Sequence, residues 1–283
     1  MKNKAIDQEF KKYLLDKGYV VETAIYYSYN VFHYQKWLDQ HPILLAKATY
    51  NDLMDYVAYL QSSGKSSIII NKHLKSIDLY YNYLELPNIA STLRLRKHKT
   101  AARLFLNEKV LEDLYNLYES SSIMDQLLVG FTIYQALELH DLMLLTTAGI
   151  DLTKGTIYIP SGKHLKISRT LALKATQILP IQNYLQQKGS SDLLFLGDYS
   201  KNQLGNRLSR IHKRLQSLTK ESNIKYQHLR QLRQSRIVVW IKQYGLREAQ
   251  YLSGHKGISS IERYQKQDIE DLRKQIKKFH PLG

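Results

Sequence analysis

The stretch that decides how this chain is interpreted is HLRQLRQSRIVVWIKQYGLREAQYLSGHKGISSIERY, residues 228–264. Its spacing is helical, and Arg230, Arg233 and Arg236 follow one another at intervals of three, which predicts that they share one helix face. The run IVVWI that comes next indicates that part of this helix is buried. Because buried arginines need anionic partners, the face is expected to meet an anion. A solvent-exposed helix face is the other interpretation.

A histidine and a tyrosine follow these arginines. His255 comes after a short predicted helix, and Tyr264 stands nine residues further on. A phenol is a weak nucleophile at neutral pH because its pKa is about 10. Attack on a phosphodiester therefore needs cations that stabilise the developing charge, a task that suits the planar fork of arginine. The set predicts a tyrosine nucleophile, although a lone tyrosine or histidine is more often a packing residue.

A basic loop precedes this stretch. The segments GTIYIP and SRTLAL are rich in β-branched and apolar residues, and between them lies SGKHLKI. This pattern predicts a β-hairpin with a basic tip. Lys163 is the candidate functional residue of the tip, with Lys166 close to it. A lysine or a histidine can protonate a leaving 5′ oxygen.

The composition narrows the class of protein. The chain has 41 Lys and Arg against 25 Asp and Glu, a formal charge of +16, for which nucleic acid is the usual partner. A merely basic protein is the alternative. The absence of cysteine excludes disulfides and Cys-ligated zinc, and the scattered histidines show no metal-ligand spacing. No apolar run approaches about 20 residues, and no signal peptide is evident, so we expect a cytoplasmic protein without a membrane span.

The pattern along the chain predicts two domains. Residues 1–93 contain four amphipathic helices with short connections, typical of an all-α bundle. Residues 105–283 contain helices around the hairpin, including one helical stretch over 123–145. The connection at 94–104 is basic, and it is either a solvated linker or a strap on the phosphate backbone. Its candidate DNA-binding residues are Arg94, Arg96, Lys97, Lys99 and Arg103.

The ordered set resembles the catalytic signature of the tyrosine recombinases, the phage-integrase and Xer-type site-specific recombinases. That family has an arginine in a helix, a Gly-His about two dozen residues later, and the nucleophilic tyrosine nine residues after the histidine. Arg233, Gly254-His255 and Tyr264 match in order and spacing. The hairpin is similar to the family's second and third strands, whose turn bears the catalytic lysine, and Lys163 is the best match.

The resemblance implies a mainly α fold with a small antiparallel β-sheet. An N-terminal helical, SAM-like core-binding domain and an α+β catalytic domain would clamp double-stranded DNA as a C-shape, in a homotetramer. Tyr264 would form a 3′-phosphotyrosyl intermediate during site-specific recombination or integration, without metal or cofactor. Arg233, Arg230 and His255 would stabilise the phosphorane, and Lys163 would protonate the leaving oxygen.

Two positions depart from the family pattern. The family's first arginine is followed three residues later by an acid. Leu137 and Asp141 support this frame in QALELHD, but Glu138 stands where the arginine should be. Arg230 occupies the place of a histidine three residues before the second arginine. A carboxylate beside a phosphate repels it. Either another cation compensates, or the chain is a weakened or non-cleaving DNA-binding relative that acts as an accessory factor. Relaxation of supercoils by the same chemistry is a third possibility.

Overall fold

The computed structural model divides the chain into two compact units, Met1–Ala101 and Ala102–Gly283, and each is described by itself. The expected linker at 94–104 stays a prediction. The described residues are 7–96, 104–118, 122–162, 167–196, 198–222, 224–266 and 268–269.

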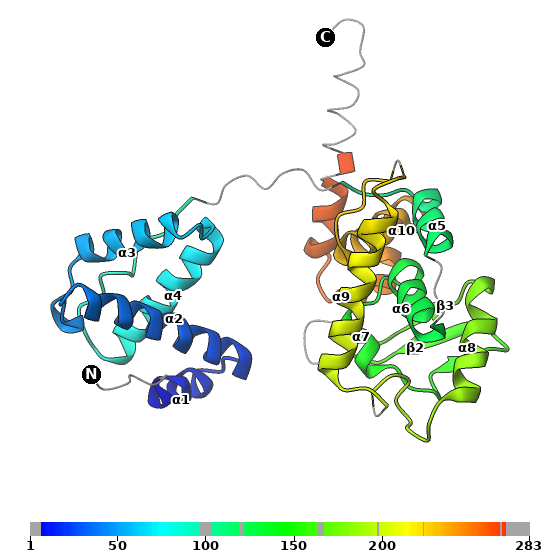
Figure 1. The fold of residues 1–283 in the computed structure, drawn as a ribbon, viewed down its shortest axis with the longest axis horizontal. Helices are drawn as coiled ribbons and strands as arrows, with labels where there is room; N and C mark the ends of the chain where they lie inside the picture. Colours follow the sequence, from blue (N-terminus) through cyan, green and yellow to red (C-terminus); the bar gives the residue numbers. More distant parts are fainter. Residues whose placement is uncertain are drawn as a thin grey trace, which may run out of the picture. The chain divides into compact units, whose positions relative to one another are not determined.

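The first unit is a helical bundle (Figure 1). Local side chains explain where its helices begin: the Asp7 carboxylate accepts a hydrogen bond from the Phe10 amide, and Thr49 and Asp52 form a capping box. The core is largely aromatic, with Tyr34 and Tyr56 fully buried. The elements are α1 (Gln8–Asp16), α2 (Val21–Gln40), the short η1 (Leu45–Lys47), α3 (Tyr50–Ser62) and α4 (Ser67–Tyr83).

The second unit surrounds a small antiparallel sheet with helices, as the sequence predicted. No helix in the described ranges of the chain is long and apolar enough to cross a membrane. The elements of the second unit are α5 (Glu108–Leu117), α6 (Ile123–Tyr134), α7 (Leu139–Leu144), β1 (Ile150–Asp151), β2 (Thr156–Ile159), β3 (Arg169–Ala172), α8 (Ala175–Gln187), α9 (Lys201–Leu218) and α10 (Leu229–Ser253).

The sheet has the order β1-β2-β3, and β2 and β3 are the neighbouring arrows of Figure 1. The register pairs Ile159 with Arg169 and Ile157 with Leu171. Successive side chains of a strand point to opposite faces. Arg169 and Leu171 therefore share the buried face of β3, which brings a charged side chain into the interior.

The stretch that was predicted as one helix over 123–145 consists of two helices, so that prediction was wrong. Between α6 and α7, Ala136 adopts a left-handed conformation with φ of 53°. The Asp141 carboxylate then accepts a hydrogen bond from the backbone N–H of Glu138 at 3.0 Å. This side-chain cap starts a new helix instead of continuing the old one. The break places the Ala136 carbonyl and the Glu138 side chain next to α10.

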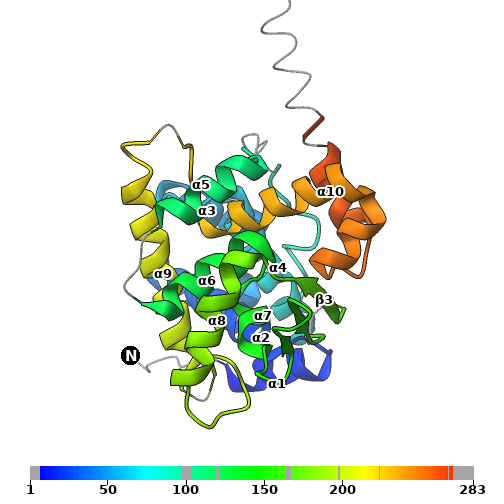
Figure 2. The same cartoon turned by 90° about the vertical axis from the view of Figure 1, so that its right-hand side faces the viewer.

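The long helix α10 contains one residue with non-helical geometry, Gly245, at φ 82° and ψ 175°. The ribbon changes direction in its second half (Figure 2). Gly254 ends the helix in the left-handed conformation, and a further helical segment covers 259–266. The glycines at 245 and 254 therefore divide the decisive stretch into three helical parts.

Candidate active site

Arg233 is the best-anchored of the predicted site residues. It lies on the first half of α10 and is almost fully buried. Its Nη1 donates to the carbonyl oxygen of Ala136, and its Nη2 donates to that of Ser253 at 3.1 Å. These carbonyls belong to the α6–α7 turn and to the end of α10. The guanidinium is therefore held in one orientation by two separate backbone segments.

Two carboxylates face the same guanidinium. Glu138 Oε1 lies 3.5 Å from Arg233 Nε, and Asp141 Oδ2 lies 3.8 Å from Arg233 Nη1. The two acids differ in accessibility, because the Glu138 side chain is 40% exposed and that of Asp141 is 2% exposed. Asp141 is thus a buried partner of the guanidinium, whereas the Glu138 side chain is partly exposed to solvent.

The structure adds Arg169, which the sequence analysis did not select. This arginine is buried, and its Nη2 lies 3.6 Å from Asp141 Oδ1. Its Nε donates to the carbonyl oxygen of Leu252 at 3.0 Å. Burial lowers the pKa of Arg169, while the charge of Asp141 opposes this shift. An arginine at an inward position of the alternating segment SRTLAL was the signal that could have revealed it.

The Gly254-His255 turn packs directly against Arg169. A Cβ atom on Gly254 would lie 2.4 Å from Arg169 Nη1, and the φ of Gly254 is +74°. Both facts require glycine at this position. The next residue is joined to the arginine site, because His255 Nδ1 lies 2.8 Å from the hydroxyl oxygen of Ser253. Ser253 therefore connects the two residues: its hydroxyl group contacts His255, and its carbonyl oxygen accepts the hydrogen bond from Arg233.

Tyr264 lies in the helical segment that follows this turn, and it is 8% exposed. Its ring is edge-on to that of Phe105, with 6.3 Å between the ring centroids. Phe105 belongs to the segment before α5 and packs against the core of the second unit. The phenol is therefore a largely buried side chain in this structure, and its role as the nucleophile stays a prediction.

The three arginines of α10 do not converge on one point. Each step of three residues along a helix falls about 60° short of a full turn. The side chains of the first and third arginines therefore point in directions that differ by roughly 120° around the helix axis. Arg230 is exposed and lines a cleft together with Glu138 and Arg233. Arg236 is buried, and its Nε donates to the carbonyl oxygen of Ile133 at 2.9 Å.

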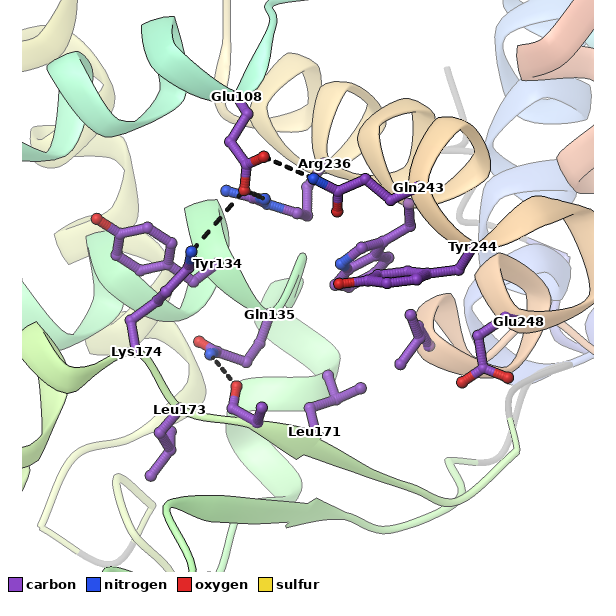
Figure 3. Close-up of a pocket in the computed structure, with 13 residues that line it drawn as sticks. Glu108, Tyr134, Gln135, Leu171, Leu173, Lys174, Arg236, Gln243, Tyr244 and Glu248 are labelled. Carbon is purple, nitrogen blue, oxygen red and sulfur yellow. Dashed lines mark hydrogen bonds and ion pairs between the residues drawn. The ribbon is translucent and has the colours of Figure 1, made fainter.

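Arg236 belongs to a separate structural contact (Figure 3). Its Nη1 donates to Glu108 Oε1 at 3.0 Å, and Gln243 Nε2 donates to Glu108 Oε2 at 2.6 Å. Lys174 Nζ also approaches this carboxylate, at 3.8 Å from Oε1. The contact ties α10 to the start of α5, so Arg236 stabilises the fold.

The remaining candidates are basic residues, and the structure describes two of them, Arg94 and Arg96. Arg94 contacts two residues of the first unit: it donates to the Ala90 carbonyl oxygen at 3.2 Å and forms an ion pair with Asp78 at 3.6 Å. Arg96 is exposed. The candidates that lie outside the described residues are Lys97, Lys99, Arg103, Lys163 and Lys166.

A metal centre finds no support in the described part of the chain. Among those residues, no group of three or more His, Asp or Glu side chains is placed to hold a metal ion. The chemistry of the described cluster is that of guanidinium groups, carboxylates and an imidazole. Such a cluster can bind and orient an oxyanion.

Family comparison agrees with the geometry. Residues 104–270 match the phage integrase family, and residues 8–87 match the phage integrase N-terminal SAM-like domain. The chain therefore belongs to the phage integrase family. It is a tyrosine-type site-specific recombinase, as the resemblance of its decisive stretch indicated.

Individual relatives are distant, and one of them matches over almost the whole length of the chain. Tyrosine recombinase XerD of Listeria innocua is 24% identical, with 99% of each chain covered. A putative tyrosine recombinase of Caldanaerobacter subterraneus is 22% identical over 57% of each chain. Two solved structures have the same fold. The Tn1549 transposon integrase, in complex with a circular intermediate DNA, has a TM-score of 0.68 at 14% identity, covering 94% of this chain and 98% of its own. A lambda integrase dimer bound to a core site has a TM-score of 0.66 at 17% identity, covering 91% and 93%.

Proposed function

We propose that Tyr264 is the nucleophile of this recombinase. Its phenol oxygen attacks the scissile phosphorus and forms a 3′-phosphotyrosyl ester, while the bond to the 5′ oxygen breaks. The leaving oxygen takes a proton and becomes a free 5′ hydroxyl. A 5′ hydroxyl of the partner strand then attacks the phosphotyrosine and restores the phenol. Because the ester bond conserves the energy of the original linkage, the exchange needs neither ATP nor a metal ion.

The observation that carries this proposal is the link between Arg233 and His255 through Ser253. Both side chains are held by one residue, at 3.1 Å and 2.8 Å respectively, so they form one preorganised group of donors. Arg233 and His255 stabilise the negative charge that develops on the non-bridging phosphate oxygens. Preorganised donors of this kind are worth about 3 kcal/mol each in the transition state. Arg230, exposed in the adjoining cleft, adds a further guanidinium.

Lys163 supplies the proton to the leaving oxygen, with Lys166 as the second candidate. Support comes from the base of the hairpin, where the backbone N–H of Ile167 donates to the carbonyl oxygen of Gly254 at 3.0 Å. The tip of the hairpin thus starts beside the turn that carries His255.

A movement of Tyr264 would assist the attack. Its ring is packed against Phe105 and is 8% exposed, and a movement out of this contact would expose the phenol to a phosphate. The ring contact is a weak, edge-on one, worth about 1 kcal/mol. Release of the 259–266 segment on DNA binding would then deliver the nucleophile to the arginines.

The partner is double-stranded DNA, which a charge of +16 attracts. The lambda integrase has been seen as a tetramer bound to a Holliday junction, and we propose the same assembly for this chain in the cytoplasm. Its two domains would clamp the duplex. The basic linker residues would lie on the phosphate backbone, and these are Arg94, Arg96, Lys97, Lys99 and Arg103.

The test is a nicked, labelled suicide duplex that carries the DNA flanking this protein's own coding sequence. The nick lets the 5′ fragment diffuse away, so the covalent intermediate accumulates. The expected result is a protein–DNA adduct that survives denaturing gels, is absent from Tyr264→Phe and forms equally well in EDTA. Tight DNA binding without adduct from the unaltered chain would contradict the proposal and favour a non-cleaving accessory factor.

A further inference from the structure

Acceptors occupy all three nitrogen atoms of the Arg233 guanidinium. Nη1 and Nη2 donate to the carbonyls of Ala136 and Ser253, and Nε faces the carboxylate of Glu138 at 3.5 Å. A phosphate that binds side-on takes the Nε–H together with one Nη–H. The edge that such a phosphate needs is therefore the edge that Glu138 faces.

These acceptors differ in how readily they can leave. The carbonyls of Ala136 and Ser253 belong to the backbone of a tight turn and a helix end, and Asp141 is buried and shared with Arg169. Among the described acceptors of Arg233, Glu138 differs from the others because its side chain is 40% exposed. Its carboxylate also belongs to the capping box at the start of α7, so a turn into solvent would give up this cap but would displace no buried side chain.

We propose that Glu138 is the exchangeable ligand of Arg233. Its carboxylate holds the guanidinium before substrate binds, and the scissile phosphate displaces it from the Nε edge. This inference rests on the proposed function, because it assigns Arg233 to the phosphate. Glu138 is therefore a positioning residue that sets the affinity of the site for a phosphate oxyanion.

Charge explains why the exchange is required. A carboxylate and a phosphate on the same guanidinium edge repel each other, so both cannot remain there. Arg230 lines the same cleft as Glu138 and offers a cation to the carboxylate once it is released. In this chain, the position of the family's first arginine thus holds an acid that orients Arg233 and opposes anions until it turns away.

The first test uses inorganic phosphate as the probe and no DNA. Phosphate binding to the full chain is measured by isothermal titration and by broadening of the phosphorus NMR signal. Glu138→Gln keeps the shape of the side chain and removes its charge. We expect this variant to bind phosphate roughly tenfold more tightly than the unaltered chain, which is the effect of one nearby like charge that solvent partly screens.

Glu112→Gln is the matched control. Glu112 is 44% exposed, close to the 40% of Glu138, and it also pairs with one cation, Lys174, at 3.6 Å. Both substitutions change the net charge equally, but only one is next to Arg233. An equal gain in both variants, or no gain in Glu138→Gln, would overturn the proposal.

A double variant locates the bound ion. Arg233→Lys keeps the charge and removes the side-on fork, so in the Glu138→Gln background it should abolish the tenfold gain. A gain that persists in the double variant would show that phosphate binds elsewhere and would also overturn the proposal. Circular dichroism checks that each variant is folded.

The second test repeats the suicide-duplex reaction with Glu138→Gln, which should form the Tyr264 adduct faster than the unaltered chain. The two arms fail separately. A tenfold gain in phosphate affinity with no adduct from any variant supports the exchange at Arg233 and contradicts the proposed nucleophile. An adduct that depends on Tyr264, without any effect of Glu138→Gln on phosphate binding, contradicts the exchange and leaves the recombinase mechanism intact.

Discussion

Arg169 and Arg233 come from β3 and α10 and face opposite oxygens of one buried carboxylate, that of Asp141. The distances are 3.6 Å to Arg169 Nη2 and 3.8 Å to Arg233 Nη1. One acid thus links the sheet, the start of α7 and the helix that carries the candidate site. With Asp141 balanced by Arg169, Arg233 keeps part of its positive charge available for a phosphate.

Replacement of Arg169 by methionine should strongly destabilise the second unit. The substitution leaves the buried carboxylate of Asp141 with a weaker counter-charge and the Leu252 carbonyl without its donor. Breaking a buried ion pair from one side lowers the free energy of unfolding by about 3–5 kcal/mol. Urea denaturation measures the loss, and Arg169→Lys, which retains the charge, should lose less. Equal losses in the two variants would contradict a role for the charge.

Gly254→Ala should be much more destabilising than Gly155→Ala. Both glycines have positive φ, +74° and +63°, so alanine has to adopt a left-handed backbone at either site, at a cost of about 1 kcal/mol. Around Gly155 a new Cβ meets nothing within 4 Å, whereas at Gly254 it would overlap the guanidinium of Arg169. We expect the midpoint of thermal unfolding to fall several degrees further for Gly254→Ala. Similar midpoints would mean that Arg169 can move aside.

The first unit should lose stability as the pH falls from about 6.5 to about 4. Burial, together with the positive charges of His33 and Lys65, lowers the pKa of His73 to about 4. The unfolded chain takes up this proton near pH 6.5. The contribution of His73 is therefore complete above pH 6.5, decreases below it and levels off near pH 4, with a total of about 3 kcal/mol.

Urea denaturation at several pH values tests this dependence. Trp37 reports on the first unit if the other tryptophan is replaced, as in Trp240→Phe. His73→Gln in that background removes the titrating group but leaves a polar side chain near the Tyr56 hydroxyl, which now lies 3.0 Å from His73 Nδ1. The slope of stability against pH should be smaller in this variant. An unchanged slope would assign the effect to carboxylates that titrate in the same range.

Sequence patterns were sufficient for most of the helices, because the signals that start and stop a helix are local. Asp7, Thr49 and Ser66 each cap the helix that follows them, and glycines such as Gly64 come just after the end of one. The hairpin was also predictable from its alternating residues. The break between α6 and α7 was missed, since Ala136 carries no sequence signal for a positive φ and the interruption depends on the Asp141 cap.

The sequence alone determined the order and spacing of Arg233, Gly254-His255 and Tyr264, and with them the family, because these intervals are covalent facts of the chain. The tertiary structure decided which side chains meet. Only packing could show that Arg233 is held by Ala136 and Ser253, that Arg169 shares the Asp141 carboxylate, and that Glu138 faces the Nε of Arg233. Such contacts join residues that lie far apart in the chain. They arise when burial forces each charged group to find a partner, and no local pattern records which partner that is.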